Sequence, residues 1–516
     1  MTISVRSTVE VDRHSNLYTS LLHAAPKIAA KDFTLWGKEA EAESSIRLNW
    51  IDLPTASRAL LPQLSTLQEW IAEKGLTHFI LAGMGGSSLG PEVLAKTYGK
   101  KLTVIDSTDP DQVLAATPSD LAHVGIIVGS KSGSTAETSS QKAHFTKVLT
   151  DAGLDPRNHF IIITDPGSPF DEASRADGYF IVNADPQVGG RFSVLSAFGL
   201  VPAAAIGIDV AALLDDAAKA SASFVTEQSS AVLLAVHILQ AAHQNIAFFD
   251  AGSNVPGLAD WIEQLIAEST GKDQKGFLPL AIESAEAAVA GPHLAIAFAD
   301  NVSHADIVVD APLGAQFILW EWVTALISIP LQINPYDQPN VTEAKTRALA
   351  LLDAWNNSVP AFTPAYESQF VQVFSTSSAH TLSGQIKDFF ATQSHYVAVM
   401  AYLARGIDDD ITQLRALTAQ LSGAGTSFGW GPRFLHSTGQ FHKGGAHNGA
   451  FIQITGENTQ DLEIPGKPFS FHTLLMAQAL GDGEALAERK FPLIRFHLKN
   501  REAGIKELVR SFKELS

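Results

Sequence analysis

From Thr77 onward, short apolar runs rich in β-branched residues alternate with longer segments of helical pattern. Such alternation is typical of parallel strands joined by crossover helices. A first set of runs predicts strands at 78–84, 101–107, 124–130, 159–165 and 179–184. A weaker repeat predicts strands at 246–252, 276–282, 294–300 and 305–311. The pattern therefore predicts an α/β protein with two tandem doubly wound domains, each built on a parallel sheet.

The segments around this alternation have a different pattern. An Ala/Leu-rich stretch over 210–242 carries few charges and predicts a helix that links to the second unit or packs across it. After Lys345 the pattern is mainly helical, and residues 423–451 are rich in glycine. We expect the following division: an N-terminal helical segment (1–70), a first α/β domain (71–209), a second α/β domain with a helical extension (210–422) and a C-terminal wrapping tail (423–516).

Composition narrows the class of protein. The chain has 516 residues, of which 46% are hydrophobic and 17% charged, and this composition predicts a folded chain of several domains. The formal net charge of −18 would repel an extended phosphate backbone, so we expect no nucleic-acid partner. Net charge acts over long range and does not determine the charge inside a cleft. The chain could therefore still contain a basic pocket for a small anion.

Redox and membrane chemistry are also constrained. The absence of cysteine excludes disulfides and cysteine-ligated zinc. The N-terminus has no apolar core typical of a secretory signal, which predicts a cytoplasmic protein. The most apolar stretch, 316–333, contains Glu321 and Pro330, so we expect a buried core helix and no membrane span.

Two hydroxyl- and glycine-rich loops follow predicted strands of the first domain. The loop GMGGSSLG (83–90) brings glycines and serines to a helix N-terminus, where free N–H groups favour an anion. The loop GSKSGSTAETSS (129–140) concentrates hydroxyls beside Lys131, and Glu137 is spaced for a capping box with Ser134. A tight turn and a helix cap are the plainer interpretations. Because both loops follow strands of one parallel sheet, we favour a shared site for a phosphate monoester.

Three further segments carry candidate chemistry. VGGRFSVLSAFG (188–199) presents Arg191 before an apolar helix, either as an anion-stabilising group or in a structural ion pair. On a predicted helix that ends at Gly271, Gln264 and Glu268 share one face, and Glu268 is a candidate base or a plain surface glutamate. INPYDQPNVTEAK (333–345) presents Gln338 on a turn and Lys345 on the next helix, where a solvated lysine is the plainer interpretation.

These five segments in this order resemble the phosphoglucose isomerase family, whose members interconvert glucose 6-phosphate and fructose 6-phosphate. The resemblance covers roughly residues 75 to 345 and rests mainly on VGGRFSVLSAFG and NPYDQPNVTEAK. The segments GWGPRFLHSTGQFHKGG and LGAQFILWEWVTA resemble the isomerase half of transaldolase–phosphoglucose isomerase fusion proteins. The resemblance implies sugar-isomerase domains of flavodoxin-like fold, a place in glycolysis and gluconeogenesis, and no cofactor.

The resemblance also implies roles for individual residues. It assigns the base to Glu268, enediolate stabilisation to Arg191 and help in ring opening to Lys345. Gln264 and Gln338 resemble the two glutamines that close around the substrate. The implied phosphate cradle consists of Gly86, Ser87, Ser130, Lys131, Ser132 and Thr135. An aldose–ketose exchange needs one carboxylate to move a proton and a cation for the oxyanion, but no metal.

The sequence departs from the family pattern in two places. Asn340 stands where most members have a small residue. The family's ring-opening histidine has no clear counterpart: His442 and His436 are the leading candidates, and His293 and His304 are alternatives. The spacing of the histidines near the glycine-rich segment fits no metal site.

Several interpretations stay open at this point. The chain could also accept mannose 6-phosphate, or it could be a sugar-phosphate sensor without catalytic activity. Arg191, Glu268 and Lys345 argue against a sensor, which would need only the phosphate loops. Conventional family members are dimers that share residues between subunits, so we expect either a homodimer or a monomer whose C-terminal tail completes the site.

Overall fold

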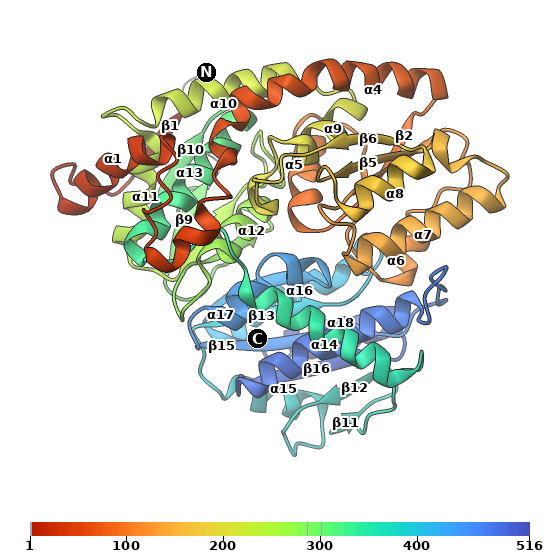
Figure 1. Cartoon of the computed structure of the whole chain (residues 1–516). Helices are drawn as coiled ribbons and strands as arrows, with labels where there is room; N and C mark the ends of the chain where they lie inside the picture. The colour runs from red at the N-terminus through yellow and green to blue at the C-terminus, as the bar shows by residue number, and fades with distance from the viewer. Residues whose placement is uncertain (1–2, 286, 301) are drawn as a thin grey trace.

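The computed structural model describes residues 3–285, 287–300 and 302–516, and three β-sheets organise this part of the chain (Figure 1). The first sheet is parallel throughout. Its strands in spatial order are β3 (Thr103–Ile105), β2 (His78–Gly83), β4 (Val124–Gly129), β5 (Phe160–Thr164) and β6 (Phe180–Asn183). Each lies within a predicted run. Because Gly83 pairs with Gly129, the two candidate phosphate loops leave the sheet side by side.

The second sheet contains the other four predicted strands and one that the hydrophobic pattern does not predict. Its spatial order is β1 (Ser4–Ser7), β10 (Ile307–Asp310), β9 (His293–Ala297), β7 (Asn245–Phe249) and β8 (Leu278–Ile282). The four later strands are parallel, whereas β1 is an antiparallel edge strand that pairs with β10. The prediction of two tandem parallel-sheet units is confirmed.

The C-terminal part contains the helices expected there and also a third, six-stranded sheet. Its spatial order is β11 (Tyr366–Glu367), β12 (Val371–Phe374), β16 (Leu493–Leu498), β15 (Gly449–Gly456), β13 (Tyr396–Ala401) and β14 (Gly425–Trp430). β13 and β15 are buried along their whole length, and β15 begins inside the glycine-rich segment 423–451, where glycines obscure the strand pattern. The domain boundaries stay predictions, but this sheet draws strands from both sides of residue 423.

Helices cover the three sheets. Those up to the end of the first sheet are α1 (Asn16–Ala29), α2 (Glu41–Ser44), α3 (Leu53–Ala56), α4 (Leu61–Lys74), α5 (Leu89–Thr97), α6 (Pro110–Ala115), α7 (Ala136–Asp151), α8 (Pro169–Asp177) and α9 (Ala197–Ala205). The later ones are α10 (Val210–Ser223), α11 (Ser230–Ala241), α12 (Leu258–Thr270), α13 (Leu313–Leu331), α14 (Pro339–Trp355), α15 (Leu382–Phe390), α16 (Gln413–Ser422), α17 (Gly439–Gly444), α18 (Phe471–Glu488) and α19 (Arg501–Lys513). Short 3₁₀ helices are η1 (Lys38–Ala40), η2 (Asn49–Asp52), η3 (Ser57–Leu60), η4 (Gly85–Ser87), η5 (Pro156–Asn158), η6 (Gly190–Phe192), η7 (Asp409–Thr412) and η8 (Arg433–His436).

The predicted helix over 210–242 is two helices. α10 ends at Ser223, and α11 begins after Ser229, whose hydroxyl accepts a hydrogen bond from the N–H of Val232. A serine cap of this kind satisfies one of the free N–H groups at a helix start. Five consecutive polar residues at 226–230 mark this break in the sequence. The prediction of one helix was wrong because it gave more weight to the apolar stretches on either side.

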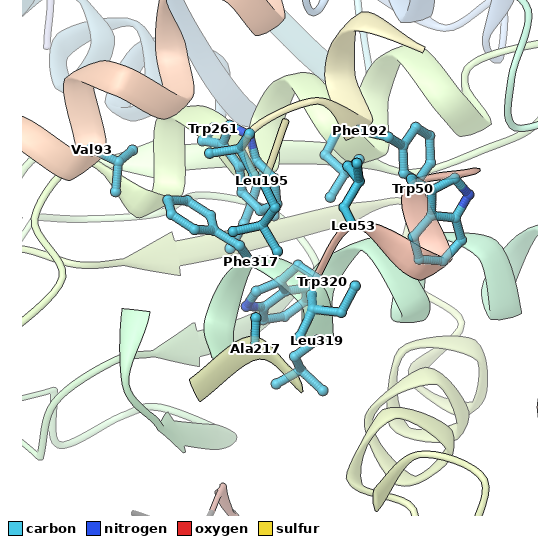
Figure 2. Packing of buried hydrophobic residues seen from close by; sticks show 14 of the residues in the cluster. Trp50, Leu53, Val93, Phe192, Leu195, Ala217, Trp261, Phe317, Leu319 and Trp320 are labelled. Carbon is cyan, nitrogen blue, oxygen red and sulfur yellow. The ribbon is translucent and has the colours of Figure 1, made fainter. Parts of the chain in front are cut away.

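Large aromatic side chains fill the core between the first two units (Figure 2). The ring centroids of Trp261 and Phe317 are 4.9 Å apart, and those of Trp50 and Phe192 are 5.2 Å apart. The helix α13 is long and apolar enough to span a membrane, but 89% of its apolar window is buried inside the protein. The prediction of a core helix for this stretch is therefore confirmed.

Buried ion pairs fasten the third unit to the first. Arg501, on α19, contacts Asp109 at 2.6 Å and Asp408 at 3.0 Å. Arg433, on η8, contacts Glu92 of α5 at 2.7 Å. Removing one partner of a buried pair is far costlier than losing a surface pair. The Arg433 contact holds η8, and with it His436, against the first unit.

Candidate active site

A cavity of about 210 Å³ lies at the carboxyl ends of β2 and β4, where open α/β sheets bind ligands. All but one of the residues predicted for the site line this cavity. They are Gly86, Ser87, Ser130, Lys131, Ser132, Thr135, Arg191, Gln264, Glu268, Gln338, Lys345 and His436. The exception is His442. The structure thus brings together residues from all three units, although their individual roles stay predictions.

Close backbone packing holds the first loop against the segment that carries Arg191. A Cβ atom on Gly86 would lie 1.8 Å from the carbonyl oxygen of Gly190, so only glycine fits there. Gly85 has a φ of +55°, a backbone conformation that residues with a side chain rarely adopt. The glycines therefore let two loops meet at the floor of the cavity.

The second loop offers hydroxyl groups that the helix does not use. Thr135 is the N-cap of α7, yet its side chain makes no capping hydrogen bond. The expected capping box of Ser134 with Glu137 is not formed, because the Glu137 carboxylate is held by other residues. Ser130 accepts a hydrogen bond from the N–H of Gly133 and so stiffens the turn. A helix N-terminus with spare hydroxyls and N–H groups is suited to a phosphate.

Lys131 lines the cavity and also holds this loop in place. Its ammonium donates to Asp165 at 3.1 Å and to the carbonyl of Val188 at 3.0 Å. Burial lowers the pKa of Lys131, whereas Asp165 counteracts that effect. The side chain therefore positions the loop, and its ammonium is already paired within the protein.

Arg191 is held in one orientation by a dense set of contacts. It is 4% exposed and donates to Ser269 at 2.8 Å, to the carbonyl of Pro335 at 2.6 Å and to Gln338 at 3.0 Å. Its Nη1 lies 3.1 Å from Oε1 of Glu268. A fixed guanidinium next to a carboxylate is an arrangement that can stabilise an oxyanion while the carboxylate moves a proton.

Glu268 lies in the last turns of α12, with its other oxygen turned towards Gln264. Oε2 accepts a hydrogen bond of 3.0 Å from Nε2 of Gln264, the pair expected from their spacing of four residues. The same amide nitrogen donates to the carbonyl of His436 at 2.9 Å. Gln264 therefore links the Glu268 carboxylate to the backbone of His436 in the third unit.

Lys272 supports the turn that carries Gln338, and sequence reasoning missed it. Its ammonium donates to the carbonyl of Asn334 and, at 2.7 Å, to the Asp337 carboxylate. Burial and the nearby Arg191 guanidinium lower the pKa of Lys272 to about 8. A lysine directly after a helix is usually solvated, so only the tertiary packing reveals this role.

His436 is paired with Glu137. Sequence reasoning missed this role of Glu137, for which it considered only a capping box. Nε2 of His436 lies 3.0 Å from Oε1 of Glu137, which also accepts from Gln478 at 2.7 Å. Burial opposes ionisation of Glu137, but the imidazole beside it lowers the carboxyl pKa to about 2. A carboxylate in this position orients the imidazole through its ring nitrogen.

Lys345 reaches the cavity from the exposed side of α14. The helix start is fixed by Asn340, the residue that departs from the family pattern. The N–H of Asn340 donates to Gln440 at 2.9 Å, and its side-chain oxygen accepts from the same amide at 2.8 Å. Asn340 thus ties α14 to α17 of the third unit, which gives the departure a structural reason.

The other histidines lie elsewhere, which corrects the sequence-based ranking. His442 is 3% exposed, with Nδ1 3.4 Å from the Tyr396 hydroxyl, and burial lowers its pKa to about 3. It packs in the third unit's core and does not line the cavity, so we do not retain it as a ring-opening residue. His293 bonds the carbonyl of Gly291, and His304 packs on Phe249.

The parallel sheets, with glycine- and hydroxyl-rich loops at the carboxyl ends of β2 and β4, define the class as an α/β protein whose domains resemble sugar-isomerase folds. A solved glucose-6-phosphate isomerase from Chlamydia trachomatis shares the fold, with a TM-score of 0.56 at 18% identity over 68% of this chain and 88% of that one. Residues 63–286 match the family model of phosphoglucose isomerase. The resemblance that the motifs indicate is therefore confirmed for this part of the chain.

Glucose-6-phosphate isomerases are also similar to this chain in sequence. One from Thermus thermophilus is 32% identical over 246 residues, which are 45% of this chain and 58% of the relative. Another, from Rubrobacter xylanophilus, is 34% identical over 241 residues, which are 41% of this chain and 54% of the relative. The chain therefore spans about half the length of these relatives. The resemblance of its flanks to fusion proteins stays a prediction.

Proposed function

We propose that the protein interconverts glucose 6-phosphate and fructose 6-phosphate through a cis-enediol. The observation that carries this proposal is the buried contact of 3.1 Å between Glu268 and Arg191 at the mouth of two hydroxyl-rich loops. The loops would hold the phosphate of the open-chain sugar, so that its first two carbons lie near the carboxylate. A binding protein would need the loops but not this pair.

In the proposed reaction the Glu268 carboxylate removes the hydrogen on C2 of the aldose as a proton. The electron pair forms the C1=C2 bond, and O1 takes up a proton to give the enediol. The O2 proton then leaves, C2 becomes the carbonyl, and Glu268 returns its proton to C1. Arg191 donates to the oxygen on which negative charge develops.

Ring opening is assigned to His436, with Glu137 as its positioning residue. The imidazole lines the same cavity as Glu268 and is held by a carboxylate that stays ionised at neutral pH. We assign Lys345 a supporting electrostatic role at the ring. All these groups belong to one chain, so we further propose that a monomer is sufficient for activity.

Purified protein should be tested for turnover of fructose 6-phosphate in an assay coupled to oxidation of glucose 6-phosphate. Turnover that falls by orders of magnitude in Glu268→Gln, with binding of fructose 6-phosphate retained, is the expected result. Binding without turnover by the unaltered protein would refute the proposal and favour a sensor. Mannose 6-phosphate, offered in parallel, tests the dual-specificity alternative.

A further inference from the structure

A second and larger cavity, of about 440 Å³, lies where the second and third sheets meet. Asp250 directly follows β7, Glu283 directly follows β8, and Trp430 ends β14; all three line the cavity. β8 and β14 are in contact, so the carboxyl ends of strands from two sheets converge here. This is the position in which open α/β sheets take ligands, and no step of the proposed reaction uses it.

The cations around this cavity are already neutralised by protein carboxylates. Glu92 lies 3.0 Å from the ammonium of Lys96, 2.8 Å from Arg405 and 2.7 Å from Arg433, and Asp106 lies 2.9 Å from Arg433. Three further carboxylates line the cavity, those of Asp250, Asp260 and Asp409. Arg415 has its own partner in Glu283. Phosphate recognition depends on cationic groups that the ligand can neutralise. Among the described residues this cavity offers no such surplus of positive charge.

Two buried polar atoms of residues that line this cavity lack hydrogen-bond partners in the described part of the chain. Oε1 of Glu263 and Nη1 of Arg415 make no hydrogen bond, although these residues are 7% and 2% exposed. A buried polar atom without a partner costs free energy. Burial and the nearby Asp260 raise the pKa of Glu263 well above its ordinary value, so its carboxyl can donate as well as accept. A hydroxyl group, both donor and acceptor, suits both atoms.

An aromatic surface completes the lining. The rings of Phe428 and Trp430 lie 5.2 Å apart at 81° and both contribute to the cavity. Such rings offer an apolar face beside polar groups, which matches the C–H and O–H faces of a polyol. The volume is in the range of small-molecule sites.

We propose that this cavity binds an uncharged polyhydroxylated ligand, a sugar or sugar alcohol without a phosphate group. Glu263 and Arg415 bond its hydroxyls, and Trp430 covers its apolar face. The site lies behind the first: on α12, Glu263 lines the second cavity and Gln264 lines the first.

The test is saturation-transfer NMR on the full chain with sorbitol or glucose at millimolar concentration. We expect binding by the unaltered protein and a loss of about tenfold in affinity in Trp430→Leu and in Glu263→Met. Trp70→Leu, which alters a half-buried tryptophan on α4, is the matched control and should bind as before. Lys345→Met, in the first cavity, should also leave polyol binding unchanged and so separates the two sites.

Thermal unfolding of each variant accompanies the binding measurement, and if Glu263→Met does not fold, Trp430→Leu decides alone. The proposal is overturned if neither polyol binds, or if both bind equally to all variants. It is also overturned if inorganic phosphate or putrescine binds in a Trp430-dependent manner while sorbitol and glucose do not. None of these outcomes depends on isomerase turnover, so failure of this proposal would not refute the proposed function, and failure of the proposed function would not refute this proposal.

Discussion

Replacement of Glu137 by glutamine tests the ring-opening assignment. In the structure the pKa of Glu137 falls from 4.5 to about 2, equivalent to roughly 3 kcal/mol in favour of the carboxylate. Burial acts against this, and His436 provides the largest favourable contribution. Glutamine keeps the shape but loses the negative charge that faces the imidazole of His436. We expect kcat/KM for fructose 6-phosphate to fall by up to about 100-fold.

The assay should separate ring opening from proton transfer. 5-Deoxyfructose 6-phosphate has no C5 hydroxyl and cannot close a furanose ring, so it reaches the enzyme already open. Exchange of its C1 hydrogen with D₂O, followed by NMR, reports proton abstraction alone. We expect Glu137→Gln to retain this exchange within a few-fold and Glu268→Gln to lose it.

A matched control removes a neighbouring hydrogen bond without removing the charge. Gln478 donates to the same oxygen of Glu137 at 2.7 Å. Gln478→Met should therefore reduce kcat/KM for the cyclic substrate much less than Glu137→Gln. Equal losses on cyclic and acyclic substrates in Glu137→Gln would refute the reasoning, because the carboxylate would then act on the proton-transfer step.

Three further outcomes are expected. Gly86→Ala should lower stability by about 1–3 kcal/mol in urea titration, because its Cβ would strike the Gly190 carbonyl, whereas Gly190→Ala, with open space around it, should not. Burial lowers the pKa of His442 from 6.5 to about 3, so between these pH values the unfolded chain binds a proton there and the folded protein does not. The free energy of unfolding should therefore decrease as the pH falls from 6.5 to 3. His442→Leu should reduce this decrease without reducing turnover. Light scattering should show an active monomer, and activity that vanishes on dilution would contradict this.

Much of the first two sheets could be predicted from the sequence because their strands are short apolar runs separated by helical periods. β4 and β5 are buried along their whole length and follow each other with a helix between them, the simplest case for pattern reasoning. The third sheet could not be found this way. Its strands β13 and β15 are separated by η7, α16, β14, η8 and α17, and glycines at the start of β15 obscure the strand pattern.

In the candidate site, too, contacts between residues close in the sequence could be predicted, whereas contacts between distant residues could not. Gln264 and Glu268 could be paired from their spacing on one helix, and their hydrogen bond follows from that spacing. The contact of Glu137 with His436 joins positions 299 residues apart, which no local pattern encodes. For the same reason His442 ranked beside His436: both lie in one glycine-rich segment, and only packing separates a core histidine from one in the cavity.

The most direct test of the account is hydrogen exchange at C1 of fructose 6-phosphate in D₂O, measured by proton NMR with equal amounts of unaltered protein and Glu268→Gln. We expect the unaltered protein to replace a single C1 hydrogen with one stereochemistry, and the glutamine variant to bind the sugar but exchange none. Undiminished exchange by the variant, or replacement of both C1 hydrogens, would contradict proton transfer by this one carboxylate.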